Sequence, residues 1–315
     1  MPRPSASPPS CRPTSRRSSS TACSTGWPRS RTHWSRNDRR FGGGRVRNRA
    51  RSSAVAADVT ALAPERSTAV ACRAARTARW ALVDVVRGVA IVAVVLYHLV
   101  WDLGHFGVTE HWARTPSGRM TGHVIAGTFL LLTGVSLALA HRHSVDLRTF
   151  GRRLLKLLAA AYAITAVSLV LAPQFMVTFG ILQNIALTSA LLLPFLRASR
   201  LVAIGAALIS AALPAIVSID STSRWVTWTG LTPTLSPSLD VQPLLPMFAL
   251  SLLGLVLTRT LLGNEALRDR VASWQPTGPV STASQTLGRH TLAIYLAHQP
   301  VLFGALSLLV LLELI

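Results

Sequence analysis

Residues 79–107 constrain the fold more than any other segment, because they combine a long apolar run with ionisable side chains. Residues 85–100 are almost wholly apolar, and with their flanks they can cross a hydrocarbon core of about 30 Å. The ionisable residues of interest are Asp84, Arg87, His98 and Asp102. Charges on a membrane helix are costly and normally face a bundle interior or a water-filled cavity. We therefore expect a membrane helix that forms one wall of a polar site.

The spacing of these residues predicts which face of the helix lines the polar site. At about 100° per residue, one set of positions falls within about 40° of a single line along the helix. The set is Asp84, Gly88, Ile91, Val95, His98 and Asp102. The line has ionisable groups at both ends and apolar side chains between them. It is therefore predicted to face the inside of the bundle.

Composition supports a membrane protein. Half of the 315 residues are apolar and 14% are charged, against about 25% in soluble domains. The net charge of +20 is concentrated in residues 1–79, which hold 17 arginines and three acids. No folded basic module with aromatic or groove-reading elements is visible, so no nucleic-acid partner is expected. Cys11, Cys23 and Cys72 all lie in this tail, which excludes a thiol nucleophile or a disulfide elsewhere.

Residues 1–79 are rich in Arg, Ser and Pro and lack a periodic apolar pattern, so we expect a disordered tail. The tail has no apolar segment of the kind that a secretory signal needs. Its Arg- and Ser-rich, acid-poor composition suits an organellar transit peptide, but we prefer the interpretation that the start codon was assigned too early.

Seven apolar segments follow the tail. They predict an all-α, polytopic transmembrane helix bundle over residues 80–315, with about seven spans. The expected helices are 81–103, 121–140, 153–172, 178–196, 201–218, 242–262 and 288–312, with a loop at 219–241 and a polar linker before the last helix. Gly127 and Gly134 are expected to allow close helix packing. Basic residues concentrate in alternate connections, so the N-terminus is predicted to be cytoplasmic and the protein multi-pass in the inner cell membrane.

The polar residues within the spans each allow a structural interpretation. Asp84 and Arg87 are three residues apart and can form an interfacial salt bridge, or Arg87 can contact a phosphate or cofactor. A membrane histidine such as His98 is often hydrogen-bonded to a neighbouring helix. However, Asp102 lies four residues further on, and a carboxylate-oriented histidine suits general-base or nucleophilic catalysis.

Two further pairs are Gln183 with Asn184, and His298 with Gln299. Either pair can act through interhelical hydrogen bonds worth about 0.6 kcal/mol each, or can line a polar cavity. The interhelical role is favoured by spacing alone. His105, His111 and His123 lack the i, i+4 spacing of a helical metal pair, so no metal site is expected.

Several segments resemble one family of membrane acyltransferases in the expected order. They are VDVVRGVAIVAVVLYH (83–98), the H-x-x-W-D-L form (98–103), GTFLLLTGVSLALA (127–140), FGILQNIAL (179–187), LLPMFALSLLG (244–254) and GRHTLAIYLAHQPVL (288–302). Together they resemble a bacterial family related to heparan-alpha-glucosaminide N-acetyltransferase, and more distantly the family 3 membrane acyltransferases. The likeness spans about residues 80–302.

The resemblance implies an enzyme that moves an acyl group, in the first instance acetyl, from cytoplasmic acyl-CoA to an acceptor such as a sugar amine or hydroxyl. It marks Asp84 and Arg87 in D-x-x-R-G, His98, Gln183 in G-I-L-Q, and Tyr295 and His298 in Y-L-x-H. Asn184 stands where relatives often carry a basic residue. In the eukaryotic relatives the catalytic histidine lies after the first helix, and both His105 and His111 are near that position.

These observations combine into one hypothesis with two competitors. We expect Asp84, Arg87, Gln183, Asn184, Tyr295 and His298 to contact acyl-CoA, and His98, oriented by Asp102, to act as the base or as a transient acyl carrier. Membrane lipid, acyl-CoA and a glycan or other small acceptor are the expected partners, and an oligomer is compatible with the sequence. The alternatives are a secondary transporter that uses the same polar line, or a non-catalytic membrane subunit.

Overall fold

A computed structural model describes residues 80–142, 144–234 and 238–314. The expected disordered tail therefore lies outside the described residues. Throughout the described ranges the regular structure is helical, as the apolar periodicity predicts. The longer helices are α2 (Ala81–His105), α3 (Pro116–Ala140), α4 (Leu147–Leu171), α5 (Ile181–Leu191), α6 (Arg200–Ile216), α8 (Phe248–Leu262), α9 (Glu265–Ser273), α10 (Pro279–Arg289) and α11 (Thr291–Leu311). A short turn of helix, α7, covers Arg224–Thr227.

All seven expected helices are present, but the polar linker before the last one is wrong. Residues 265–273 form α9 and residues 279–289 form α10, with a short non-helical segment between them. The side chain of Asn264 accepts a hydrogen bond from the Leu267 amide and so caps α9. Pro279 occupies the first turn of α10, where its missing N–H costs nothing. Helix α3 also begins at Pro116, five residues earlier than expected, with the Thr115 side chain as its cap.

The lengths of the helices support fewer complete spans than expected. Within the described ranges, four helices are long and apolar enough to cross a membrane, namely α2, α3, α4 and α11. A fifth span is possible if α8 and α9 count together, although they are bent by 105° at their junction. The expected helix over 178–196 is only the 11-residue α5, about 16 Å long at 1.5 Å per residue. Seven full spans are therefore not confirmed, and α5 is too short to cross the core alone.

Two close helix crossings hold the bundle together. Where α3 crosses α8, a Cβ on Gly134 would collide with the Ser251 carbonyl, and one on Gly254 with the Leu131 carbonyl. Gly134 thus allows the close packing expected of it, as small residues do in membrane bundles. Where α10 crosses α2, Gly88 meets the Ser284 carbonyl and Gly288 meets the Asp84 carbonyl in the same way.

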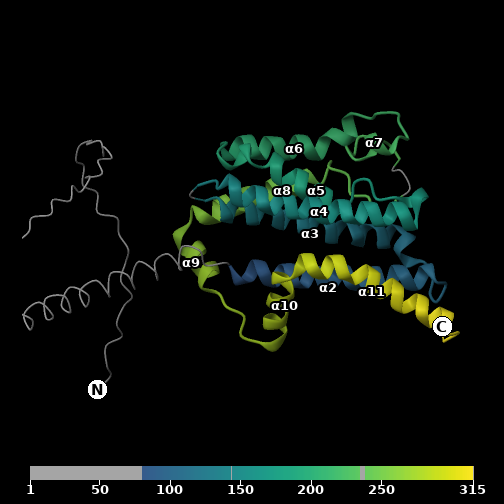
Figure 1. Cartoon of the computed structure of the whole chain (residues 1–315). Coiled ribbons are helices and arrows are strands. Elements are labelled where there is room, and N and C mark those ends of the chain that lie inside the picture. Colours follow the sequence, from purple (N-terminus) through teal and green to yellow (C-terminus); the bar gives the residue numbers. More distant parts are fainter. Residues whose placement is uncertain (1–79, 143, 235–237, 315) are drawn as a thin grey trace, which may run out of the picture. The chain divides into compact units, whose positions relative to one another are not determined.

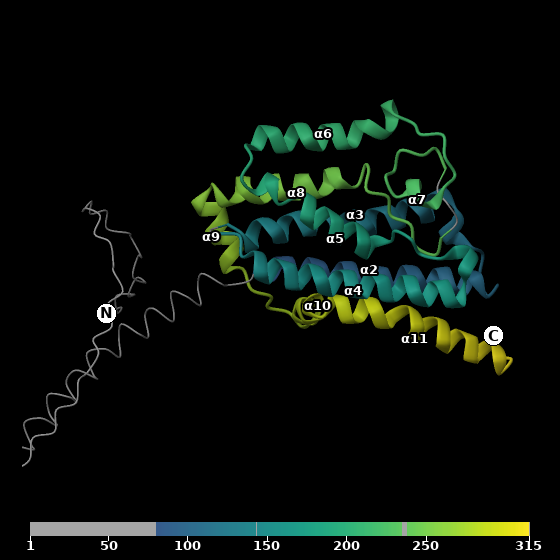
Figure 2. The same ribbon diagram turned by 45° about the horizontal axis from the view of Figure 1, so that its top comes forward.

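The arrangement of the helices sets the two sides of the bundle (Figure 1). Helix α6 packs on α8 at one side, α10 and α11 contact α2 at the opposite side, and α3 lies between. Helix α10 runs across α2, whereas α11 runs along it in both views (Figure 2). Apolar side chains of α3, α6 and α8 form the largest buried cluster, which includes Leu137, Ala203 and Leu252.

Candidate functional site

The polar line of α2 faces the bundle, as its spacing predicts. Asp84, Gly88, Ile91 and Asp102 are buried, and His98 is partly buried. The opposite face of α2 is exposed, with Val89 at 58% and Leu96 at 56%. The ionisable groups therefore point toward α3, α10 and α11, which contact α2.

Asp84 and Arg87 form the salt bridge that their spacing allows. The distance from Arg87 Nη1 to Asp84 Oδ1 is 3.3 Å, and Asp84 Oδ2 lies 3.7 Å from Nε of Arg289 on α10. Arg87 also donates to Ser136 Oγ on α3. One buried carboxylate thus joins α2 to α10, and its partner arginine joins α2 to α3. Removing Asp84 would leave these two arginines without their shared counter-charge.

The other polar centre lies between the second half of α2 and the first half of α11, and we call it the histidine pair. The rings of His98 and His298 meet edge to face, with their centroids 4.9 Å apart. His298 is buried, and its Nδ1 lies 2.7 Å from the Tyr295 carbonyl. An N–H at Nδ1 donates to that carbonyl, which leaves Nε2 as an acceptor in the neutral ring. No hydrogen-bond partner within the described residues reaches this Nε2.

Asp102 does not orient His98 in the way that the i, i+4 spacing suggested. Its Oδ1 instead accepts a hydrogen bond of 2.8 Å from Gln299 Nε2 on α11. The i, i+4 positions bring two side chains onto one face, but the packed α11 supplies a closer partner. Asp102 Oδ2 and Gln299 Oε1 are buried without hydrogen-bond partners among the described residues. Buried polar atoms of this kind normally bind water or a ligand.

An aromatic cluster lies at the C-terminal end of α2, on the far side of His98 from Asp84. Trp101 stacks on His105 with a centroid distance of 5.2 Å, and His111 meets the same indole edge to face at 5.7 Å. Both ring nitrogens of His111 are buried without partners in the described part of the chain. Burial, together with the charges of Arg114 and His105, lowers the pKa of His111. The ring is therefore held neutral, as a base or acceptor requires.

Gln183 makes an interhelical contact, and Asn184 joins α5 to the loop before α8. Gln183 donates to the Ala161 carbonyl and to Thr165 Oγ1 on α4, and its Oε1 accepts from the Gly180 amide. Asn184 is fully buried, donates to the Gln242 and Pro243 carbonyls, and accepts from Thr188. Their polar groups are thus used within the protein, and contact of either residue with acyl-CoA stays a prediction.

Asp240 is a polar residue that the sequence did not mark as part of a site. It lies in the loop before α8, and its Oδ2 accepts from the Ile181 amide at 2.9 Å and from the Tyr295 hydroxyl at 3.4 Å. Burial raises its pKa, and these two hydrogen bonds oppose the shift. In the sequence it appeared only as an acid in a loop, because nothing local indicates that the loop folds inward.

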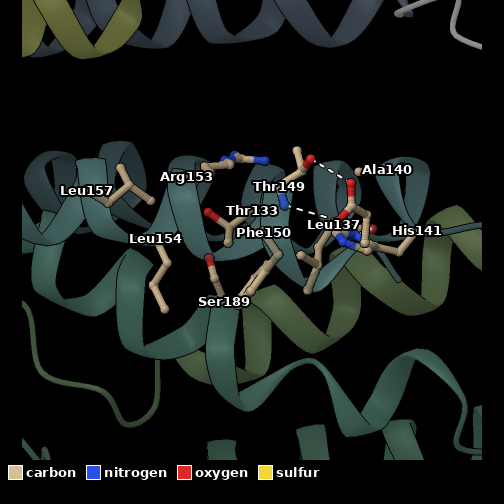
Figure 3. Close-up of a pocket in the computed structure, with 11 residues that line it drawn as sticks. Thr133, Leu137, Ala140, His141, Thr149, Phe150, Arg153, Leu154, Leu157 and Ser189 are labelled. Carbon is tan, nitrogen blue, oxygen red and sulfur yellow. Dashed lines mark hydrogen bonds between the residues drawn. The ribbon is translucent and has the colours of Figure 1, made fainter. Parts of the chain in front are cut away.

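A cavity of about 280 Å³ lies between α3, α4 and α5 (Figure 3). Its floor is apolar and includes Leu137, Phe150 and Leu154, while Arg153 supplies a guanidinium and His141 an imidazole. Asp146 lies at its edge and accepts from the Thr149 side chain and from the Arg148 and Thr149 amides, which lowers the pKa of its carboxyl. The expected site residues do not line this cavity. The basic segment 141–156 was its only sequence signal.

The residues brought together thus form two polar centres and one separate cavity. Among the described residues, no group of three or more His, Cys, Asp or Glu side chains is placed to hold a metal ion. No curated protein and no solved structure matches the chain. The family model described as heparan-alpha-glucosaminide N-acetyltransferase, catalytic, matches residues 79–300, which includes α2, the histidine pair and Asp240. The chain therefore belongs to the heparan-alpha-glucosaminide N-acetyltransferase catalytic-domain family, whose members are membrane transferases.

Proposed function

We propose that this protein is a multi-pass enzyme of the inner cell membrane that transfers an acetyl group from cytoplasmic acetyl-CoA to an amine or hydroxyl acceptor, such as that of a sugar. The observation that carries the proposal is the histidine pair within a chain of this family. His98 is partly exposed, and Nε2 of His298 has no hydrogen-bond partner among the residues that the structure describes. Two imidazoles in contact offer a proton acceptor next to a second group that can receive or return the proton.

The cavity between α3, α4 and α5 supports the proposal that acyl-CoA is the donor of the acetyl group. An acyl-CoA carries phosphates at one end and an apolar, amide-containing arm at the other. The cavity has the matching division, with Arg153 and His141 over an apolar floor. An arginine presents five donors in a planar fork that suits phosphate oxygens. Arg87 of α2 contacts Ser136 of α3, and the next residue of α3, Leu137, lines the cavity.

The proposed reaction uses His98 as the base. The acceptor N–H or O–H gives its proton to the imidazole as its heteroatom bonds to the thioester carbonyl carbon. The carbon–sulfur bond then breaks, and the CoA sulfur takes the proton back from the imidazolium. In the variant with a covalent intermediate, the imidazole nitrogen of His98 bonds to the acetyl carbon as the carbon–sulfur bond breaks and CoA leaves as the thiolate. The acceptor heteroatom then displaces the imidazole from the acetyl carbon, and its proton goes to the CoA thiolate.

The unpartnered polar atoms near the end of α2 support an acceptor rich in hydroxyl or amine groups. Asp102 Oδ2 and Gln299 Oε1 are acceptors without donors in the described residues. A bound hydroxyl or ammonium group would donate to them and remove the cost of leaving them unpaired. Positive charge in alternate connections supports the proposed orientation, with the N-terminus in the cytoplasm.

The experiment uses the purified full chain in liposomes with radiolabelled acetyl-CoA, and with glucosamine and water as trial acceptors. We expect labelled acetylglucosamine or CoA release. His98→Ala is expected to lower turnover about 100-fold or more, in the range that general-base catalysis contributes. His123→Ala is the matched control, because His123 is exposed on α3 and distant in sequence from the pair.

Two outcomes would contradict the proposal. Absence of both transfer and hydrolysis with a folded wild-type protein would refute the acetyltransferase function, and proton-driven solute uptake in the same liposomes would favour a transporter. Full turnover in His98→Ala would remove His98 from the reaction. A rise in the KM for acetyl-CoA in Arg153→Gln, with kcat preserved, would support the cavity as the donor site, and an unchanged KM would exclude it.

A further inference from the structure

The carboxylate of Asp240 connects two elements that are distant in the sequence. One oxygen, Oδ2, accepts both from the backbone amide of Ile181, the first residue of α5, and from the hydroxyl of Tyr295 on α11. A carboxylate at a helix N-terminus is favoured, because it satisfies a free amide and complements the helix dipole. The second bond, to Tyr295, is not needed for capping α5 and asks for another explanation.

The loop that carries Asp240 is held on both sides of it. The Leu239 amide donates to the Phe175 carbonyl at 2.9 Å, and the Gln242 amide donates to the Phe179 carbonyl at 3.1 Å. Asn184 adds two side-chain bonds to the carbonyls that follow, at 2.9 Å each. Gly180 leaves the space that the carboxylate fills, since a Cβ there would collide with Oδ2. Asp240 is thus a fixed point rather than a loop residue free to rotate.

Tyr295 passes this constraint to the histidine pair. Its ring lies 5.4 Å from the ring of His298, centroid to centroid, and its carbonyl is 2.7 Å from His298 Nδ1. The ring of His298 in turn meets that of His98. Movement of Tyr295 would therefore displace the turn of α11 that presents His298.

We propose that Asp240 is a positioning residue, which ties the start of α5 to Tyr295 and so fixes the turn of α11 that places His298 against His98. The effect on catalysis rests on the proposed function, while the link between Asp240 and Tyr295 does not. Either substitution removes the same contact, and the second substitution cannot remove it again. The effects of the two substitutions on stability are therefore expected to be coupled and not additive.

The test is a double-mutant cycle on the full chain in detergent and in liposomes. It compares Asp240→Ala, Tyr295→Phe and the double variant, with Asp220→Ala, an exposed loop acid, as the control. Each single variant removes the hydrogen bond between Tyr295 and Asp240, and the loss of that bond is expected to lower kcat for acetyl-CoA turnover about three- to tenfold, with the KM unchanged. The double variant is expected to match Asp240→Ala. Asp240→Asn keeps an acceptor oxygen and is expected to retain most of the wild-type kcat.

The stability arm separates this inference from the proposed function. The apparent Tm of the double variant is expected to fall by less than the sum of the single losses, whether or not the protein is active. Additive Tm losses would overturn the link between Asp240 and Tyr295. The positioning role would be overturned if the kcat of the double variant fell by the product of the two single-variant losses. It would also be overturned if Asp240→Asn were as slow as Asp240→Ala. If the Tm losses of the variants are coupled but the folded wild-type protein shows no acetyl transfer, the proposed function is refuted and the link between Asp240 and Tyr295 still holds.

Discussion

Substitution of Gly288 by alanine tests the crossing of α10 with α2, on which the position of α11 depends. A Cβ at this position would fall well inside contact distance of the Asp84 carbonyl carbon and oxygen. These are backbone atoms, so they cannot swing aside as the end of a side chain can. The two helices must separate, and Arg289 must withdraw from Asp84.

The expected loss follows from opposing contributions. Overpacking of this kind costs up to about 3 kcal/mol, and replacing a helical glycine by alanine returns about 1 kcal/mol. The ion pair adds little, because the Arg289 side chain is 51% exposed. The net loss is about 2 kcal/mol, or a fall of about 4–8 °C in Tm for a domain of this size.

The assay is the apparent Tm from intrinsic tryptophan fluorescence in detergent, with Gly151→Ala as the matched control. Gly151 is also helical, on α4, but a Cβ there meets nothing within 4 Å. The control is expected to raise Tm by about 2–4 °C, since it gains helix propensity of about 1 kcal/mol without a collision. A Tm for Gly288→Ala equal to or above that of Gly151→Ala would refute the close crossing.

Two further predictions concern the loop before α8. Asn184→Leu is expected to cost about 1–3 kcal/mol, because it leaves the Gln242 and Pro243 carbonyls without their buried donor; a Tm within 1 °C of wild type, on the order of 0.3 kcal/mol, would contradict this. The raised pKa of Asp240 means that the folded state binds more protons than the unfolded state between 3.8 and the raised value, so its contribution to stability falls as pH rises through that window. The Tm of wild type relative to Asp240→Asn is therefore expected to fall from about pH 4 to pH 7, and a constant difference would exclude the shift.

The apolar periodicity was sufficient to predict the seven apolar helices, their order and the buried line of α2. Helices α9 and α10 were missed because their polar, proline-containing sequence is typical of a linker, although Pro279 is favourable in a first helical turn. The count of about seven spans is not confirmed, since apolar runs alone do not show that α5 ends at Leu191.

The candidate site was predicted in part. The salt bridge of Asp84 with Arg87 follows from a spacing of three residues and is confirmed. The contact of His98 with His298, and that of Asp102 with Gln299, join residues about 200 positions apart, with a separation of 197 for the second pair. Such contacts depend on how α11 packs against α2, and the spacing of residues within one segment gives no information about that packing. The inward fold of the Asp240 loop was missed for the same reason.

The late position of α11 in the chain has a consequence for biosynthesis. Helix α2 is the first described helix to leave the ribosome, and it enters the membrane with Asp102 before its partner Gln299 has been made. Asp102 must therefore keep its hydration, or a temporary partner, while the intervening helices are inserted. A nascent chain that stalls before α11 would leave this carboxylate in the membrane without its partner from α11.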